Sequence, residues 1–390
     1  MAISGAEYVE QVGSQTYTIK KSVKETAAPA DTTKARALSY LLCNRWTFGC
    51  LFSFAFIWII SAIFCNSSEP YSYNEDTKSW VITPGSKIIW KTEGYGRSYF
   101  GKFGLGFIPD ISEERRKVVM LWGDSFVEAF QVDDKYKMTQ QLTKLLAKDD
   151  QNLICASRAM GGDNIADYIL NIPQYEKIIP SISRHIIVIN GSADILPDQS
   201  NDTRGIFSAK NGYKLIRSDT HFHSASVKSL INKYRLYFLL PILQSVTRDI
   251  SLRFTPGHVY KKHFYTNDNQ SNKQKELQSN EAWEFLTKAI KESTNKNVTI
   301  VYVPHVPRIE NHRIAYNDPD WSVVGEFAEY CHSAGIDFIN MHDIFVSNYM
   351  ATGKFPKGFT NSLPGEGHLN IDGHRLIAEA IFKYLKEKEQ

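Results

Sequence analysis

The stretch VVMLWGDSFVEAF, Val118 to Phe130, marks the point where an apolar strand gives way to a helix. Its first part is a short apolar run, typical of a strand that is covered on both faces of a sheet. The run stops at Gly123-Asp124-Ser125, and an amphipathic helical pattern follows. Gly123 permits a tight turn, and Asp124 can stabilise it by accepting backbone N–H bonds. The stretch therefore predicts a serine presented at the end of a strand, at the start of a helix.

A serine in this position has two readings. The carboxyl end of a parallel strand is where open α/β sheets place their ligands. The backbone N–H of Ser125 would be available there to a developing negative charge. The alternative is that Ser125 only caps the following helix, because serine is a common N-cap residue.

The chain after residue 117 alternates between apolar runs and helical patterns. The predicted strands are Val118–Leu121, Leu153–Ala156, His185–Asn190, Val298–Val303 and Ile336–Asn340. The predicted helices are Lys137–Ala147, Ile165–Gln174, Glu281–Ser293, Val323–Ala334 and Ile371–Lys386. This alternation predicts right-handed βαβ units, and hence a three-layer, doubly wound parallel sheet covered by helices. A polar insertion, residues 196–280, interrupts the pattern.

A serine nucleophile needs a base, so the eleven histidines decide between the two readings. Most of them lie in polar loops or on helix faces. Near the C-terminus, PGEGHLNIDGHRLIAEAIFKYL has a glycine-flanked loop that delivers His368 just before an amphipathic helix. The loop follows the last predicted strand and opens at the carboxyl edge of the sheet. His374 falls inside the helix, where packing or capping is the expected role.

Together these stretches resemble the conserved blocks of the SGNH/GDSL hydrolase superfamily, from about Val118 to Leu385. GDS after the first strand resembles block I, and HLNIDGH before the last helix resembles block V. ASRAMGGDNIADYIL resembles block II, in which a glycine N–H helps to form the oxyanion hole; Gly161 aligns best, with Gly162 as the alternative. HIIVINGSADILPD stands in the place of block III, usually Gly-x-Asn-Asp, and matches it at Gly191 and Asp194. The resemblance implies a flavodoxin-like order of strands.

Two positions depart from the family pattern. Ala193 stands where the family has its oxyanion asparagine, and losing one such donor typically costs ~10²–10³ in rate. We expect Ser192, Asn190 or Asn164 to supply a donor instead, or the chemistry to be altered or weaker. Gly365 stands where the family has an aspartate three residues before the histidine. The nearest acid is Glu366, which we expect to orient His368; Asp372 is less suitable because it begins the helix.

The resemblance implies a covalent acyl-transfer mechanism without a cofactor. His368 would deprotonate Ser125, which attacks an ester carbonyl to give an acyl-enzyme. The N–H groups of Ser125 and Gly161 would bind the oxyanion. Water as the acceptor makes the protein a serine esterase, and a sugar hydroxyl makes it an O-acetyltransferase. A third hypothesis, suggested by Ala193, is a catalytically impaired carbohydrate-binding protein on the same scaffold.

Phe48–Cys65 is a run of 18 residues without a charge, apolar all round and long enough to cross a bilayer core of ~30 Å. A cleaved signal peptide is disfavoured because 47 residues precede the run and no small-x-small site follows it. Lys34, Arg36 and Arg45 precede the run, whereas acidic residues dominate after it. The positive-inside rule predicts a single-pass protein of the inner (cytoplasmic) membrane with its C-terminal part periplasmic or extracellular.

The expected organisation is therefore a cytoplasmic tail (1–47), a transmembrane helix (48–65), a lead-in segment (66–117) and an SGNH hydrolase-like domain (118–390). This location makes an O-acyl ester of envelope carbohydrate the expected substrate, and a transferase would need a multi-spanning partner that exports acyl groups.

The formal net charge is +3 without a dense Lys/Arg tract, so no nucleic-acid partner is expected. Among the five cysteines no C-x-x-C spacing predicts a metal site, and Cys155 and Cys331 are expected to be buried free thiols.

Overall fold

The computed structural model has two compact units, Met1–Ile57 and Trp58–Gln390, which are described separately below. The structure describes residues 8–12, 15–19, 32–67, 71–106, 111, 116–149, 152–195, 206–207, 213–216, 230–231, 233–239 and 280–389. Most of the polar insertion at 196–280 lies outside the described residues. Within it, β10 (Ile206–Phe207) pairs antiparallel with β11 (Leu215–Ile216).

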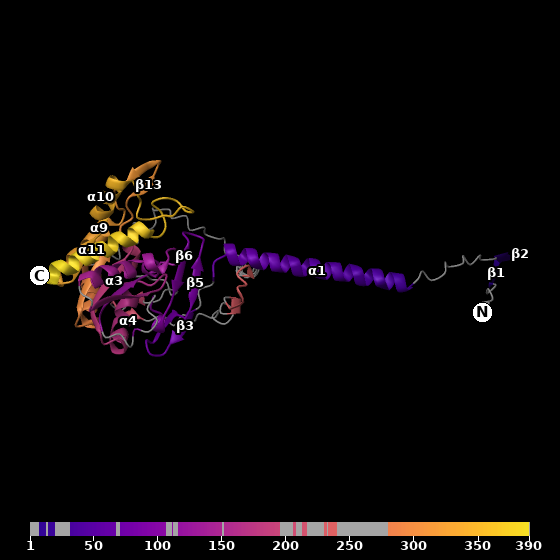
Figure 1. Ribbon diagram of the computed structural model, residues 1–390, viewed down its shortest axis with the longest axis horizontal. Coiled ribbons are helices and arrows are strands. Elements are labelled where there is room, and N and C mark those ends of the chain that lie inside the picture. Colours follow the sequence, from indigo (N-terminus) through magenta and orange to yellow (C-terminus); the bar gives the residue numbers. More distant parts are fainter. Residues whose placement is uncertain are drawn as a thin grey trace. The chain divides into compact units, whose positions relative to one another are not determined.

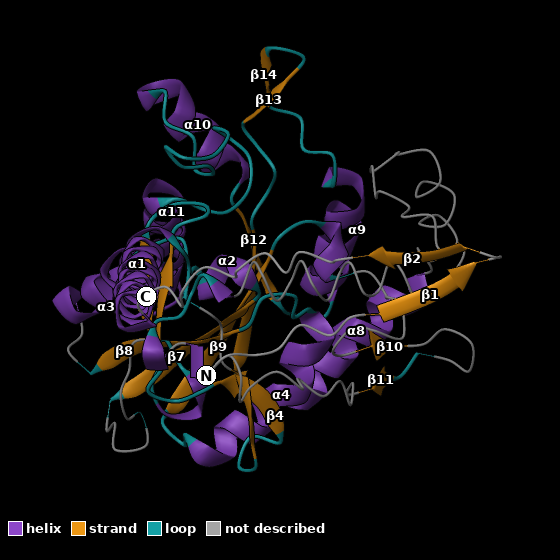
Figure 2. Ribbon diagram, turned by 90° about the vertical axis from the view of Figure 1, so that its right-hand side faces the viewer, coloured by secondary structure: helices purple, strands orange, loops and turns teal. Residues whose placement is uncertain are grey.

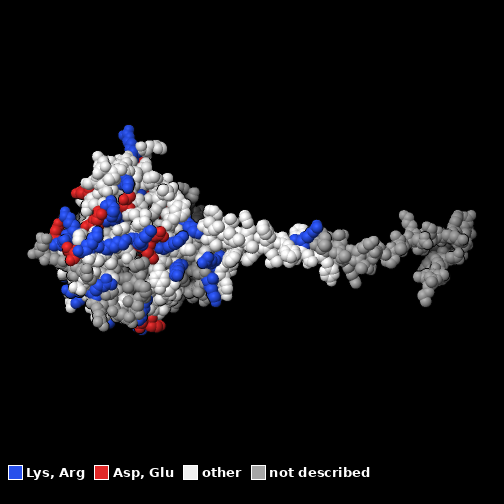
Figure 3. All heavy atoms as spheres, in the orientation of Figure 1, with Lys and Arg blue, Asp and Glu red and all other residues white. Residues whose placement is uncertain are grey.

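The described residues of the N-terminal part form one antiparallel strand pair and one long helix. Strand β1 (Tyr8–Val12) pairs with β2 (Gln15–Ile19), and α1 spans Thr32–Phe64. Within α1, the 22 residues Cys43–Phe64 have a mean hydropathy of 2.1, so this segment is long and apolar enough to cross a membrane. Figure 3 shows uncharged residues along most of this helix. The predicted apolar run, Phe48–Cys65, overlaps this segment from Phe48 to Phe64; the segment begins five residues earlier, and Cys65 follows the end of the helix.

A five-stranded parallel sheet forms the centre of the second unit. Its strands are β7 (Lys117–Gly123), β8 (Leu153–Ala159), β9 (Ile182–Ile189), β12 (Asn297–Tyr302) and β15 (Asp337–Asn340). They lie in the order β15-β12-β9-β7-β8, so the first strand is inserted between the second and the third. This is the flavodoxin-like order, and its switch point lies at β7 and β9. The predicted fold class and all five predicted strands are confirmed.

Helices cover both faces of the sheet, which gives the three predicted layers (Figure 2). On one face, α3 (Met138–Asp149) and α11 (Ile371–Glu389) pack with Leu142, Ile377 and Ile381 against the strand residues Leu121 and Val188. The helices of the other face are α4 (Ile165–Ile178), α8 (Asn280–Ser293) and α9 (Trp321–Ser333). All five predicted helices are present. Both apolar clusters form because alternate residues of each strand point to opposite faces.

Several elements were not predicted. Helix α10 (His342–Thr352) follows β15, and the hairpin β13 (Arg308–Glu310)–β14 (Arg313–Ala315) lies between β12 and α9; both are in the upper part of Figure 1. In the part of the chain that the structure describes, three short 3₁₀ helices, η1 (Lys102–Gly104), η2 (Asp134–Tyr136) and η3 (Ser192–Asp194), occur in connections. Cys155 and Cys331 are buried free thiols, as expected, and burial raises the pKa of both.

The lead-in segment is more regular than its composition indicates. It forms two antiparallel hairpins, β3 (Tyr71–Asn74)–β4 (Ser79–Ile82) and β5 (Lys87–Trp90)–β6 (Gly96–Tyr99). Ile82, Ile88 and Phe100 form a small core of their own, together with Phe130 from the loop after α2 (Ser125–Glu128). The second hairpin therefore lies against the segment that carries the candidate serine.

Candidate active site

Ser125 is the first residue of α2 (Ser125–Glu128), directly after β7. The N-cap of this short helix is Asp124, whose Oδ1 accepts the Phe126 N–H at 2.9 Å. The hypothesis that Ser125 serves only as the cap is therefore wrong, because the preceding aspartate caps the helix. Glycine is needed at 123, since a Cβ there would lie 2.3 Å from the Val127 side chain. The turn leaves the Ser125 side chain available for chemistry at the carboxyl edge of the sheet.

His368 lies beside this serine. Its Nε2 is 3.1 Å from Ser125 Oγ, and its side chain is 28% exposed. The loop that carries it is held by the Gly358 N–H, which donates to the His368 carbonyl at 3.0 Å. Asn370 fixes the same loop, because its Nδ2 donates to the carbonyls of Phe355 and Gly358 while its Oδ1 caps α11. The serine and histidine singled out in the sequence are thus brought within hydrogen-bonding distance, 243 residues apart in the chain.

The carboxylate that contacts His368 is Glu93, from the turn between β5 and β6. Its Oε2 lies 2.6 Å from His368 Nδ1, and its Oε1 accepts the His368 backbone N–H at 2.8 Å. Gly367 is required beside it, because its φ is +71° and a Cβ there would lie 2.1 Å from Glu93 Oε1. The Gly94 N–H donates to Asn361 Oδ1 at 2.7 Å, which ties the glutamate turn to the histidine loop.

The electrostatics of the pair follow from these contacts. Burial alone would raise the pKa of Glu93, but the hydrogen bonds and the charge of His368 outweigh burial, and the pKa is lowered. Glu93 is therefore ionised at neutral pH and can hold the proton of the ring at Nδ1, which leaves Nε2 to face Ser125. The arrangement Glu93–His368–Ser125 has the geometry of an acid–base–nucleophile triad.

The expected acid, Glu366, is not the partner of His368. Its carboxylate lies 3.2 Å from His305 Nε2, on the loop after β12, whereas Glu93 occupies the Nδ1 side of His368. Asp372 forms ion pairs with Lys354 and Arg375. Sequence reasoning missed Glu93 because nothing in KTEGYG distinguishes it from any turn glutamate. The only signal was indirect: the usual aspartate position is Gly365, so the acid had to come from elsewhere.

His374 packs inside the domain, as predicted. It is fully buried, and its Nδ1 accepts the Met138 N–H at 3.3 Å. Burial, with Lys137 nearby, lowers the pKa of His374 to about 3, so it remains neutral.

The block II turn lies next to the serine. A Cβ on Gly161 would be 3.7 Å from the Ser125 Cβ. The Gly161 N–H, however, already donates to Glu128 Oε2 at 3.2 Å. Gly162 has a φ of +81°, and its N–H, like that of Ser125, has no acceptor among the described residues. Asn164 caps α4, and its Oδ1 accepts the N–H groups of Ala166 and Asp167.

The block III turn is the 3₁₀ helix η3. The Ser192 hydroxyl donates to Asp320 Oδ1 at 2.7 Å, so the expectation that it replaces the missing asparagine does not agree with its position. Gly191, with a φ of +79°, leaves room for the same carboxylate, since a Cβ would lie 2.8 Å from Asp320 Oδ2. Ala193 is exposed. Asp194 Oδ2 accepts the Asn190 N–H at 2.6 Å and thereby closes the turn.

Three ionisable side chains near Ser125 and the block III turn, Asp124, Asp194 and Lys357, are buried. Burial raises the pKa of Asp124 to about 6, and burial together with the charge of Asp124 raises that of Asp194. Lys357, 2% exposed, donates from Nζ to Asn190 Oδ1 at 3.1 Å, and burial lowers its pKa to about 8. Among the described residues, no group of three His, Cys, Asp or Glu side chains is placed to hold a metal ion.

A groove of about 630 Å³ lies beside the loops that carry Glu93 and His368. Gly94, next to Glu93, and Gly358, bonded to the His368 carbonyl, both line it. Its wall also contains the aromatic side chains of Tyr95, Tyr136, Phe355 and Phe359 and the carboxylates of Asp133 and Asp372. The volume falls within the ~300–1,000 Å³ typical of ligand pockets.

No family model and no curated protein matches the sequence. Several solved structures are similar to it at low sequence identity. The psychrotrophic esterase EstA from Pseudoalteromonas sp. is 12% identical, covering 70% of this chain and 98% of that one, with a TM-score of 0.33. The acetyl xylan esterase AlAXEase is 13% identical, covering 69% and 99%, with a TM-score of 0.36. A lipolytic G-D-S-L family protein from Veillonella parvula is 12% identical, covering 69% and 98%, with a TM-score of 0.34.

These TM-scores are low, so the fold assignment rests on the sheet itself. The strand order β15-β12-β9-β7-β8, the serine after the first sheet strand and the histidine before the last helix all lie within the described residues. The architecture and the placement of the Ser125–His368 pair in it agree with the SGNH/GDSL hydrolase fold that the sequence motifs resemble.

Proposed function

We propose that this protein is a membrane-anchored serine esterase that cleaves O-acyl esters of envelope carbohydrate. The observation that carries the proposal is the contact series from Glu93 through His368 to Ser125 Oγ, at 2.6 and 3.1 Å. A serine hydroxyl is a weak nucleophile by itself and becomes reactive when an oriented imidazole can take its proton. An assembled triad also favours an enzyme over a binding protein on an impaired scaffold.

The proposed reaction uses these three residues in turn. Ser125 Oγ attacks the ester carbonyl carbon as its proton passes to His368 Nε2, and the imidazolium is stabilised by Glu93 at Nδ1. The carbonyl oxygen becomes an oxyanion, for which the Ser125 N–H and a block II N–H are the candidate donors. The protonated imidazole then gives its proton to the leaving alcohol. Water, deprotonated by His368, attacks the acyl-enzyme and releases the acid.

We propose a carbohydrate as the alcohol part of the ester substrate because of the groove beside the loops that carry Glu93 and His368. Aromatic faces and carboxylates lining one groove offer a sugar both stacking surfaces and hydrogen-bond acceptors. The membrane part of the proposal rests on Cys43–Phe64 and on the basic residues Lys34, Arg36 and Arg45 before the apolar run, which favour a cytoplasmic N-terminus.

The test is ester turnover by the full-length protein in detergent micelles. We expect p-nitrophenyl acetate hydrolysis by the wild type, its loss in Ser125→Ala, and labelling of Ser125 by a fluorophosphonate. Ser333→Ala is the matched control, because Ser333 is exposed at the end of α9 that faces away from the carboxyl edge. Hydrolysis that survives in Ser125→Ala would place the chemistry elsewhere. Supplying an acetylated donor with an unacetylated glycan then separates the alternatives: acyl transfer faster than hydrolysis would identify an O-acetyltransferase.

A further inference from the structure

Glu128 is a buried carboxylate next to the candidate nucleophile that the proposed chemistry does not use. It lies on α2, three residues after Ser125, and is 5% exposed. Its Oε2 accepts the Gly161 N–H at 3.2 Å and would lie 3.3 Å from a Cβ on that glycine. A side chain from the helix of block I thus holds the backbone of block II.

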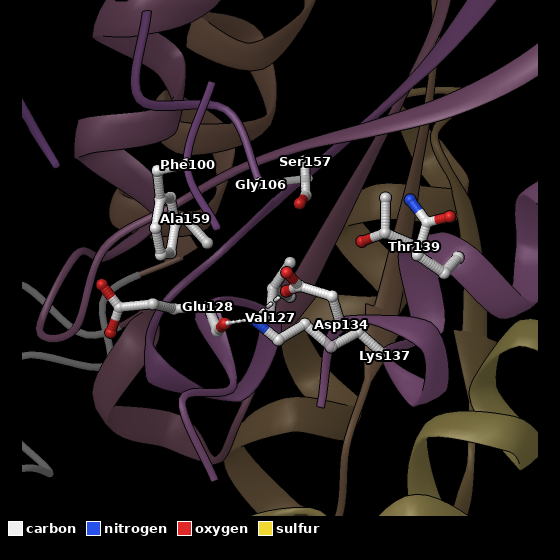
Figure 4. Close-up of a pocket in the computed structure, with 10 residues that line it drawn as sticks. Phe100, Gly106, Val127, Glu128, Asp134, Lys137, Thr139, Ser157 and Ala159 are labelled. Atoms are coloured by element: carbon white, nitrogen blue, oxygen red, sulfur yellow. Dashed lines mark hydrogen bonds and ion pairs between the residues drawn. The ribbon is translucent and has the colours of Figure 1, made fainter. Parts of the chain in front are cut away.

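The main chain of Glu128 is held as firmly as its side chain. Its carbonyl oxygen accepts from Lys137 Nζ at 2.8 Å. Lys137 also donates to Ser98 Oγ at 2.6 Å and forms an ion pair with Asp134 Oδ1 at 3.0 Å. Figure 4 shows this lysine reaching the Glu128 carbonyl, while the Glu128 carboxylate points away from it. Glu128 therefore has its backbone anchored on one side and its carboxylate directed to the block II turn on the other.

This contact determines which N–H groups remain for an oxyanion. The Gly161 N–H is occupied by Glu128, whereas the N–H groups of Ser125 and Gly162 have no acceptor among the described residues. Gly161 and Gly162 follow each other in a turn, and glycines adopt many backbone conformations. A hydrogen bond at the first of them restricts the orientation of the peptide unit that carries the N–H of the second.

We propose that Glu128 is a positioning residue of the oxyanion hole, which fixes the block II turn so that Gly162, with Ser125, donates to the oxyanion. The proposal rests on the acyl-enzyme function proposed above. In this proposal Gly162 is the oxyanion donor of the block II turn, rather than Gly161, which matches the family pattern better by sequence. Oxyanion donors must lie 2.7–3.1 Å from the developing charge, and a misplacement of ~1 Å can cost ~10²-fold in rate.

The experiment compares Glu128→Ala with Glu128→Gln in the full-length protein. Glutamine keeps an oxygen that can accept the Gly161 N–H, whereas alanine removes it. For p-nitrophenyl acetate we expect Glu128→Ala to lower kcat by ~10–10²-fold with KM changed less than about twofold, because an oxyanion donor acts in the transition state. We expect Glu128→Gln to stay within a few-fold of wild type. Thr139→Ala is the matched control, since Thr139 lines the same cavity of about 10 Å³ as Glu128 and lies on α3, away from the block II turn.

A second readout does not depend on activity. Hydrogen exchange of the peptide that contains Gly161 and Gly162 should become faster in Glu128→Ala and stay slow in Glu128→Gln and Thr139→Ala. Unchanged exchange in Glu128→Ala overturns the proposal even if the protein turns over no ester. A rise in kcat of Glu128→Ala overturns it as well, since Glu128 would then be withholding Gly161 from the hole. So does a folded Glu128→Gln as slow as Glu128→Ala, because charge rather than the acceptor would then matter.

Discussion

Replacing Glu93 with glutamine tests the residue that the structure adds to the site. In the wild type, Oε2 of Glu93 accepts the proton at His368 Nδ1, and Oε1 accepts the His368 backbone N–H. A glutamine can keep the second bond with its carbonyl oxygen, but its amide nitrogen then faces Nδ1. A donor at that position favours the tautomer with its proton on Nε2, which can no longer take the proton from Ser125.

The expected loss can be worked from this geometry. In a serine-protease triad, exchanging the carboxylate for an amide lowers kcat by about 10⁴. The side chains of Glu93 and His368 are 18% and 28% exposed, so water can restore part of the lost orientation. We therefore expect kcat for p-nitrophenyl acetate to fall by about 10³–10⁴, or roughly 4–5.5 kcal/mol at about 1.36 kcal/mol per tenfold. KM should change little.

Glu366→Gln is the matched control, because it changes the same residue type two positions from His368 and removes only the contact with His305. Its kcat should stay within about twofold of wild type. A large loss in Glu366→Gln together with a small one in Glu93→Gln would refute the assignment of the acid. Near-wild-type kcat in both variants would show that no carboxylate is needed at Nδ1.

The same substitution should change stability in acid. The folded-state pKa of Glu93 lies below its ordinary value of 4.5, so its contribution to stability is present above that pH and is lost as the pH falls through the folded-state pKa. The difference in Tm between wild type and Glu93→Gln should therefore be constant near neutral pH and shrink below about pH 4.5. A difference that grows on acidification would contradict the lowered pKa.

Two further predictions concern block III and the membrane. Ala193→Asn places a donor on an exposed position of η3, where the SGNH/GDSL pattern has its oxyanion asparagine. It should raise kcat by about tenfold or more with KM unchanged. Unchanged kcat in the folded variant would mean that the oxyanion hole is already complete. A reporter that is active only outside the cytoplasm, fused after Gln390, should be active because basic residues precede the apolar run. If that reporter is silent and a cytoplasmic reporter is active at the same point, the predicted orientation is wrong.

The elements of the sheet could be predicted from the sequence because their signals are local. A short apolar run such as Val118–Leu121, rich in β-branched residues and closely followed by a glycine, is typical of a buried strand, and the periodic apolar residues of Ile371–Lys386 define one face of a helix. Ser125 and His368 were found for the same reason, since each stands at a glycine-marked boundary of such an element. The parallel order then brings both to the carboxyl edge of one sheet, and the structure has them 3.1 Å apart.

The partners of these residues depended on the tertiary structure. Glu93 reaches His368 across 275 residues, because the β5–β6 turn is tied to the histidine loop through Gly94 and Asn361. Glu366 is close to His368 in sequence, yet its side chain lies against His305, because neighbouring loop residues need not point the same way. Ser192 and Gly161 were sensible donors by position, but their hydrogens are directed to Asp320 and Glu128. The sequence alone thus determined which residues stand at the carboxyl edge of the sheet, since strand and helix boundaries are set by nearby residues. Only the packing of distant segments decided where each hydrogen bond goes, since a hydrogen bond depends on atomic distance and direction that local patterns do not encode.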